Sequence, residues 1–154
     1  MILLHRSNAG NGGYWYEFYK TLNYLPTYNI AFCPTQSPST FKRYKTYGVN
    51  FSWTASECRL FIGDDQLLDQ AKVSSLADFP LFGDTVFTPP TWPDQMWMFY
   101  PTVTGIGGGV HLRHNENANM VFVDGHVESC GRQRLKNVGI SEAVGKNGAV
   151  ITLP

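Results

Sequence analysis

The side chains best suited to bind a metal or to move a proton lie in the second half of the chain. They are Asp84, His114, Asp124 and His126. Carboxylate oxygens and imidazole nitrogens are common metal ligands, and both groups take part in acid–base catalysis. A tight turn after Asp124 would bring it close to His126. Two candidates follow: a divalent-metal site of Asp84, His114 and Asp124, and a metal-dependent enzyme site of His114, Asp124 and His126.

The same residues also fit a purely structural motif, and this interpretation explains more of the pattern. Asp-Gly between two runs of strand-forming residues is typical of a type I′ hairpin turn, in which Gly125 supplies a positive φ. His114 could hydrogen-bond the backbone of that turn and hold the preceding loop. We therefore expect His114, Asp124, Gly125 and His126 to form a structural motif without a cofactor. A bound Ca²⁺ or other divalent ion is the alternative, although imidazole is a poor calcium ligand.

Two strands of a hairpin, at residues 119–123 and 126–130, are expected to position this motif. A two-residue turn would pair Phe122 with Val127, so that both side chains lie on the same face as Met120. The first strand is apolar on both faces. This pattern predicts an interior strand next to a more exposed partner.

The region around this hairpin resembles the signature of prepilin-type His-x9-Asp-Gly proteins, a bacterial family of pseudopilin-like subunits. His114 is followed by nine residues and then by Asp124-Gly125. Further matching blocks occur upstream in the family's order. They are Phe32-Cys33-Pro34, Tyr47-Gly48-Val49-Asn50 and Leu81-Phe82-Gly83-Asp84.

The resemblance implies a type IV pilin-like globular head with a structural role, and not an enzyme. Such a head polymerises with sister pilin-like subunits in a secretion or surface filament outside the cytoplasm. Members of the family begin with a leader and a long apolar helix that anchors them in the membrane. The apolar run at residues 1–4 is far shorter than the roughly 20 residues of a span. We therefore expect that the anchoring helix is missing and that this chain itself does not contact the membrane.

Length and composition predict one folded domain that does not bind nucleic acid. The chain has 154 residues, and its 12 basic and 12 acidic side chains cancel in net charge. The three cysteines, Cys33, Cys58 and Cys130, lack the Cys-x-x-Cys spacing of common zinc sites. Their spacing also leaves open which of them, if any, form a disulfide.

We expect a single α+β domain over residues 1–154, a pilin-like head with an antiparallel β-sheet and long loops. Residues 1–13 are predicted to be flexible and residues 14–130 to form the core. Residues 131–154 are predicted to form a C-terminal strand or tail. These expectations follow from the glycine-rich start of the chain, the strand-like centre and the short apolar pieces after residue 131.

A short N-terminal helix over residues 14–24 is predicted to pack on the sheet. Trp15, Phe18, Tyr19 and Leu22 recur at helical spacing within it. Further strands are predicted at 47–53, at 59–62 before Gly63, and at 79–87, which is apolar around Gly83-Asp84.

Residues 88–109 are predicted to form a long loop, because they contain several prolines and a run of glycines. We expect this loop to cover the sheet or to contact neighbouring subunits. Its Trp92 and Trp97 support an alternative function, binding of a carbohydrate or another extracellular polymer.

Overall fold

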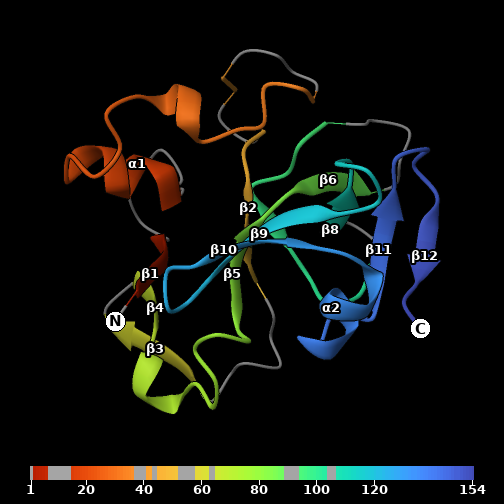
Figure 1. Ribbon diagram of the computed structural model, residues 1–154. Coiled ribbons are helices and arrows are strands. Elements are labelled where there is room, and N and C mark those ends of the chain that lie inside the picture. Colours follow the sequence, from red (N-terminus) through yellow and green to blue (C-terminus); the bar gives the residue numbers. More distant parts are fainter. Residues whose placement is uncertain are drawn as a thin grey trace.

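The computed structural model describes residues 2–6, 15–36, 41–42, 45–51, 58–62, 65–88, 94–103 and 107–154. This part of the chain forms an α+β fold with three β-sheets and two short α-helices (Figure 1). The predicted fold class, a sheet-rich α+β head with a small helix and long loops, is confirmed. The two larger sheets are mixed rather than antiparallel, since each contains one parallel pair of strands.

A five-stranded sheet with the order β10-β9-β5-β2-β7 forms the centre of the molecule. Its first three pairs are antiparallel and the pair of β2 and β7 is parallel. The strands are β2 (Gly48–Asn50), β5 (Pro80–Gly83), β7 (Met98–Phe99), β9 (Ala118–Phe122) and β10 (Val127–Cys130). Because β9 lies between β5 and β10, the predicted interior strand beside an outer partner is confirmed.

Two smaller sheets flank the central one (Figure 1). The four-stranded sheet has the order β12-β11-β8-β6, in which β8 and β11 run parallel. Its strands are β6 (Thr85–Thr88), β8 (Gly107–Leu112), β11 (Glu142–Gly145) and β12 (Val150–Thr152). The antiparallel three-stranded sheet β1-β4-β3 consists of β1 (Ile2–Arg6), β3 (Arg59–Ile62) and β4 (Asp65–Leu68).

The helices are short. They are α1 (Trp15–Thr21), α2 (Arg132–Asn137) and the 3₁₀ turns η1 (Tyr28–Ile30) and η3 (Gln70–Lys72). Within the described ranges, no helix has the length and apolar character needed to cross a membrane.

Helix α1 packs on the sheet as predicted, but it is shorter than expected. Trp15 and Tyr16 are buried, whereas Leu22 follows the end of the helix and is largely exposed. The indole N–H of Trp15 donates to the carbonyl of Tyr47 at 3.1 Å, and its ring lies 4.7 Å from that of Phe82. The helix ends before Leu22, so this residue does not contribute to the buried face of α1. Trp15 and Tyr16 form that face instead.

The buried apolar side chains form two clusters. One joins β8, β9, β10, α2 and β11, and it includes Phe99, Val110, Leu112, Met120, Phe122, Leu135, Ile140 and Leu153. The other lies under α1, and it includes Trp15, Tyr16, Val49, Phe51, Leu68, Leu81 and Val123.

The single strand predicted at 79–87 is two strands in different sheets. β5 ends at Gly83 in the central sheet, and β6 begins at Thr85 in the four-stranded sheet. Asp84 is the residue between them. An acidic residue interrupts the apolar pattern at the point where the chain changes sheets.

The hairpin of β9 and β10 is present, but its predicted register is wrong by one residue. Val127 pairs with Val121 instead of Phe122. Gly125 has φ +94°, and its N–H donates to the carbonyl of Phe122 at 3.0 Å, which is typical of a three-residue loop rather than a two-residue turn. The loop is longer because Val123 is buried in the second cluster. As a result Val127 does not share the buried face of Phe122 and is 68% exposed.

The predicted loop at 88–109 contains regular structure, so that prediction is wrong in part. It includes β7 and the first half of β8. A β-carbon at Gly108 would lie 1.8 Å from the carbonyl oxygen of Met98, and the carbonyl of Gly108 accepts from the N–H of Tyr100 at 3.0 Å. The glycine run thus allows β8 to lie directly against the segment that contains β7.

The segment 131–154 is part of the core, and the predicted limit of the core at residue 130 is wrong. It forms α2, β11 and β12 and buries Leu135, Ile140 and Leu153. The sequence signal was weak because α2 is short, basic and begins at Gly131 without a side-chain cap.

Residues 2–6, predicted to be flexible, form β1, which pairs with β4 from Ile2 opposite Leu68. The rest of that predicted segment lies outside the described residues. The strand predicted at 59–62 is confirmed as β3, and the one predicted at 47–53 is shorter as β2.

Candidate functional site

Asp84 is the centre of the candidate site, and its side chain has no solvent exposure. Its Oδ2 accepts the backbone N–H of Asn119 at 2.7 Å and lies 3.3 Å from Nε2 of His114. Its Oδ1 lies 3.7 Å from Nε of Arg113. A carboxylate buried to this degree requires such polar partners, because transfer of a charge out of water is costly.

His114 is held by a tight turn between β8 and β9. Its N–H donates to the carbonyl of Asn117 at 3.0 Å, and the N–H of Asn117 donates back at 3.1 Å. Asn115 and Glu116 have φ +52° and +63°. Two positive φ values define a type I′ turn here, nine residues before Asp124-Gly125, where the sequence pattern predicts it. Non-glycine residues in this region cost about 1 kcal/mol or more each, and here they position His114.

Cys33 completes the group from the segment between η1 and β2. Its Sγ lies 3.7 Å from Nε2 of His114 and 3.1 Å from the hydroxyl of Thr35. The buried amide of Gln95 accepts the N–H of Cys33 at 2.7 Å and donates to its carbonyl at 3.0 Å. These two hydrogen bonds fix the backbone of Cys33 and therefore the direction of its thiol.

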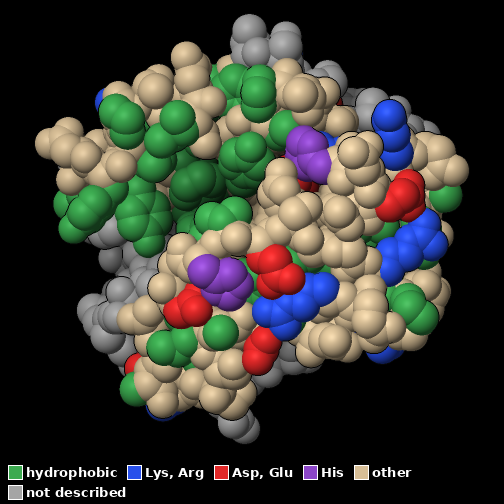
Figure 2. All heavy atoms as spheres, in the orientation of Figure 1, with side chains coloured by type: hydrophobic (Ala, Val, Ile, Leu, Met, Phe, Trp, Pro, Cys, Tyr) green, Lys and Arg blue, Asp and Glu red, His purple; other side chains and the backbone are tan. Residues whose placement is uncertain are grey.

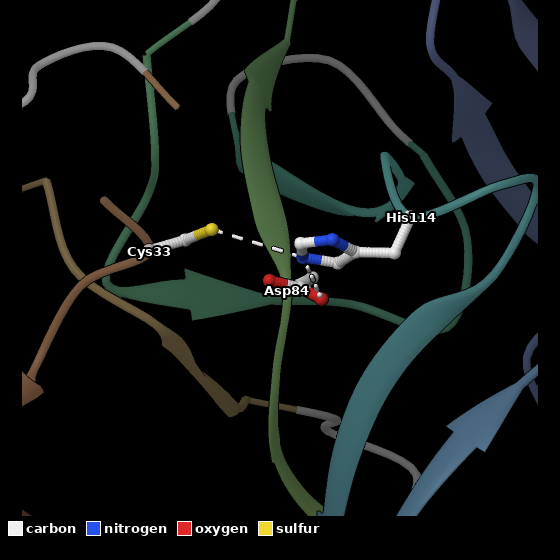
Figure 3. Close-up of side chains that lie close together, drawn as sticks. All are labelled: Cys33, Asp84 and His114. Atoms are coloured by element: carbon white, nitrogen blue, oxygen red, sulfur yellow. Dashed lines mark hydrogen bonds and ion pairs between the residues drawn. The ribbon is translucent and has the colours of Figure 1, made fainter. Parts of the chain in front are cut away.

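The side chains of Cys33, Asp84 and His114 point toward one another (Figure 3). One ligand atom from each lies within 4.8 Å of the other two. Sequence reasoning missed Cys33 because it is 81 positions from His114 and has no cysteine partner nearby. Its place in the block Phe32-Cys33-Pro34 was the available signal.

The geometry of this group does not support a nucleophilic relay. In such a relay the acid and the nucleophile contact opposite nitrogens of the imidazole. Here Oδ2 of Asp84 and Sγ of Cys33 both approach Nε2 of His114. Three donor atoms around one point are suited to hold a cation.

Charge around the group is partly balanced. Arg113, with a side chain only 4% exposed, also donates to the carbonyl of Thr85. Burial and, to a lesser degree, the neighbouring Cys33 and Asp84 raise the pKa of Tyr47 to about 12, although Arg113 acts in the opposite direction. The phenol of Tyr47 is therefore a neutral hydrogen-bonding group beside the cluster at neutral pH.

A polar pocket of about 480 Å³ opens on the other side of Arg113. It is lined by Thr35, Gln36, Val86, His111, Arg113, Lys146, Asn147 and Gly148. Burial lowers the pKa of His111 to about 4, and the charge of Arg113 contributes. His111 is therefore neutral over the physiological pH range.

Asp124 and His126 lie at the other end of β9 and do not join this group. Nδ1 of His126 is 2.6 Å from Oδ1 of Asp124, and hydrogen bonds from His126 lower the pKa of that carboxyl group. The imidazole stacks on Phe122 at 4.4 Å. The structure thus brings together Asp84 and His114 of the predicted set, but not Asp124 or His126.

The structural interpretation expects His114 to hydrogen-bond the turn at Gly125. In the structure His114 does not do so. The N–H of Asp124 donates to the carbonyl of Leu76 at 3.3 Å, and that of Gly125 donates to Phe122. His114 is directed to Asp84 instead, because its own tight turn reverses the chain before β9 begins.

Of the two tryptophans proposed to bind a polymer, Trp97 packs edge-on against Phe51, with ring centres 5.7 Å apart. It belongs to the second hydrophobic cluster. Trp92 lies outside the described residues. The position of Trp97 gives no support to an exposed aromatic platform.

Comparison with known proteins gives no match: no protein-family model, no curated protein and no solved structure is similar to this chain.

Proposed function

We propose that this chain is the head of a pilin-like, non-enzymatic subunit of a bacterial secretion or surface filament, located outside the cytoplasm. The α+β architecture with a small helix on a sheet is compatible with such a head. The His114 and Asp124-Gly125 signature supports the same reading. The observation that carries the proposal is an exposed apolar groove beside α1.

This groove lies between α1, η1 and the face formed by β5, β9 and β10 in the central sheet. It has a volume of about 420 Å³ and is lined by Trp15, Ile30, Tyr47, Phe82, Gly83, Asn119, Val121 and Val127. Ile30 is 50% exposed and Val127 is 68% exposed. Hydrophobic side chains gather over this part of the surface (Figure 2).

An open groove with an apolar lining is a surface on which an apolar segment of a partner can pack. Its neighbour β10 is the outer strand of the sheet and pairs with β9 alone in the described part of the chain. An apolar segment of a sister subunit can pack in this groove and bury its apolar lining. Polymer assembly requires a contact of this kind between subunits.

The proposal is tested by photocrosslinking in the cells that produce the protein. The crosslinking amino acid p-benzoylphenylalanine replaces Val127 at the groove or, as a matched control, Val150 on β12, which is 48% exposed. We expect the Val127 variant to give a ladder of multimers that contain this chain and the Val150 variant to give much less. Monomer alone from both positions, or equal ladders from both, would contradict the groove as the assembly surface.

A further inference from the structure

We propose that Cys33, Asp84 and His114 form a binding site for a divalent transition metal, with Zn²⁺ as the best-fitting ion. The inference stands independently of the filament role. A thiolate, a carboxylate and an imidazole are a donor set that zinc accepts. Calcium and magnesium prefer oxygen ligands alone, so this set selects against them.

The distances between the donor atoms match a tetrahedral ion. Zinc bonds of about 2.3 Å to sulfur and about 2.0–2.1 Å to nitrogen or oxygen give ligand separations of about 3.3–3.6 Å at tetrahedral angles. Nε2 of His114 lies 3.7 Å from Sγ of Cys33 and 3.3 Å from Oδ2 of Asp84. Both distances agree with two edges of one coordination tetrahedron.

A second observation concerns how the ligands are held. Oδ1 of Asp84 is buried, makes no hydrogen bond among the described residues and faces Nε of Arg113 at 3.7 Å, so the guanidinium accounts for this oxygen. The other oxygen is oriented by the N–H of Asn119, and Cys33 is oriented by Gln95. Outer contacts of this kind hold metal ligands in place.

Charge and access also fit. When Cys33 releases its proton on binding the ion, the thiolate and the carboxylate carry two negative charges, of which Arg113 offsets one, so a dication is favoured. The side chain of His114 is 32% exposed, which leaves a fourth position open to water. The three ligands come from separate parts of the chain, so the ion would link the segment before β2, the β5–β6 junction and the turn after β8.

The test is a titration of the reduced, metal-free protein with Co²⁺ and then Zn²⁺. Cobalt reports a thiolate ligand through a charge-transfer absorption band, and zinc displaces it. We expect one equivalent of Co²⁺ per chain with this band, and a higher Tm in the presence of Zn²⁺. Cys33→Ser should remove the band and weaken Zn²⁺ binding by at least about 100-fold. The matched control is Cys58→Ser, at a partly exposed thiol outside the group, and it should bind as the wild type does.

His114→Gln provides a second variant that leaves all three thiols in place and should also lose the Zn²⁺-dependent rise in Tm. Circular dichroism in the absence of metal shows whether each variant is folded. If Cys33→Ser does not fold, His114→Gln still tests the proposal. The proposal is overturned if the wild type binds no stoichiometric Co²⁺, if the band survives in Cys33→Ser, or if Ca²⁺ competes equally with Zn²⁺.

Discussion

Asp84 joins the two larger sheets through its backbone and its side chain. Its N–H donates to the carbonyl of Asn119 in β9, and its carbonyl accepts from the N–H of His111 in β8. Its carboxylate also faces Arg113, whose side chain is 4% exposed. Loss of this carboxylate would leave a buried cation unpaired, at a cost of about 3–5 kcal/mol. Asp84 thus has a structural role with or without a metal, and Cys33 and His114 are the better positions for probing metal binding.

His111 gives a prediction at the same scale. Burial, and then the charges of Arg113 and His114, lower its pKa to about 4 from an ordinary value of 6.5. The unfolded chain therefore takes up a proton at higher pH than the folded chain does. We expect the free energy of unfolding to be highest above pH 6.5 and to fall by up to about 3 kcal/mol as the pH drops toward 4. Urea unfolding at a series of pH values measures this change.

The variant His111→Gln should lose most of this pH dependence between 6.5 and 4, because glutamine at position 111 does not titrate. An unchanged slope in His111→Gln would show that other groups cause the fall in stability.

At the scale of elements, the contact between β8 and the segment containing β7 depends on glycine. A β-carbon at Gly108 would lie 1.8 Å from the backbone oxygen of Met98, which cannot move aside as a side chain could. We predict that Gly108→Ala lowers the free energy of unfolding by about 2–3 kcal/mol or more. Gly131→Ala is the matched control, since its new β-carbon would meet only the side-chain oxygen of Asn117 at 2.9 Å. Denaturant unfolding of both variants measures the difference, and equal losses would contradict the steric argument.

Local chemistry predicted the hairpin, but it could not predict the register. Asp124-Gly125 correctly indicated a turn after β9, and Gly125 does have a positive φ. The register depends on Val123, which is buried under α1 and is thereby drawn into the loop. That contact is with residues far away in the sequence. The turn at Asn115 and Glu116 contains no glycine, so the sequence pattern did not indicate it. Type I′ geometry was therefore predicted at Asp124-Gly125, which is the wrong place.

The candidate site could be predicted only in part, because contacts between residues far apart in the sequence also determine its geometry. Asp84 was recognised as an acidic residue in an apolar run that needed a partner, and His114 as a residue of the signature. Their proximity follows from the change of sheets at Asp84 and from the turn that starts at His114. Cys33 is held beside them by long-range contacts such as the one with Gln95, between segments 62 residues apart, which no local pattern encodes.

At the scale of the whole molecule, the chain after residue 130 closes the fold. β11 pairs with β8 in parallel, and the N–H of Ser141 donates to the carbonyl of Pro101 at 2.8 Å. Short apolar pieces separated by glycine predicted a strand or a tail, and residues 142–145 and 150–152 are strands. Their role becomes clear from the sheet, in which β8 has β6 on one side and needs β11 on the other.

Removal of residues 131–154 should therefore unfold the whole domain and not merely shorten it. A chain that ends at Cys130 loses the buried side chains of Leu135, Ile140, Val144 and Leu153. At about 1.5–3 kcal/mol for each, the loss is about 6–12 kcal/mol, which equals the whole stability of a typical domain. We expect this chain to show no cooperative thermal transition by circular dichroism and little dispersion in its amide NMR spectrum. A chain that lacks only the exposed Pro154 should unfold like the full-length protein. A cooperative transition in the chain ending at Cys130 would show that the fold does not need this segment, in line with the predicted core of residues 14–130.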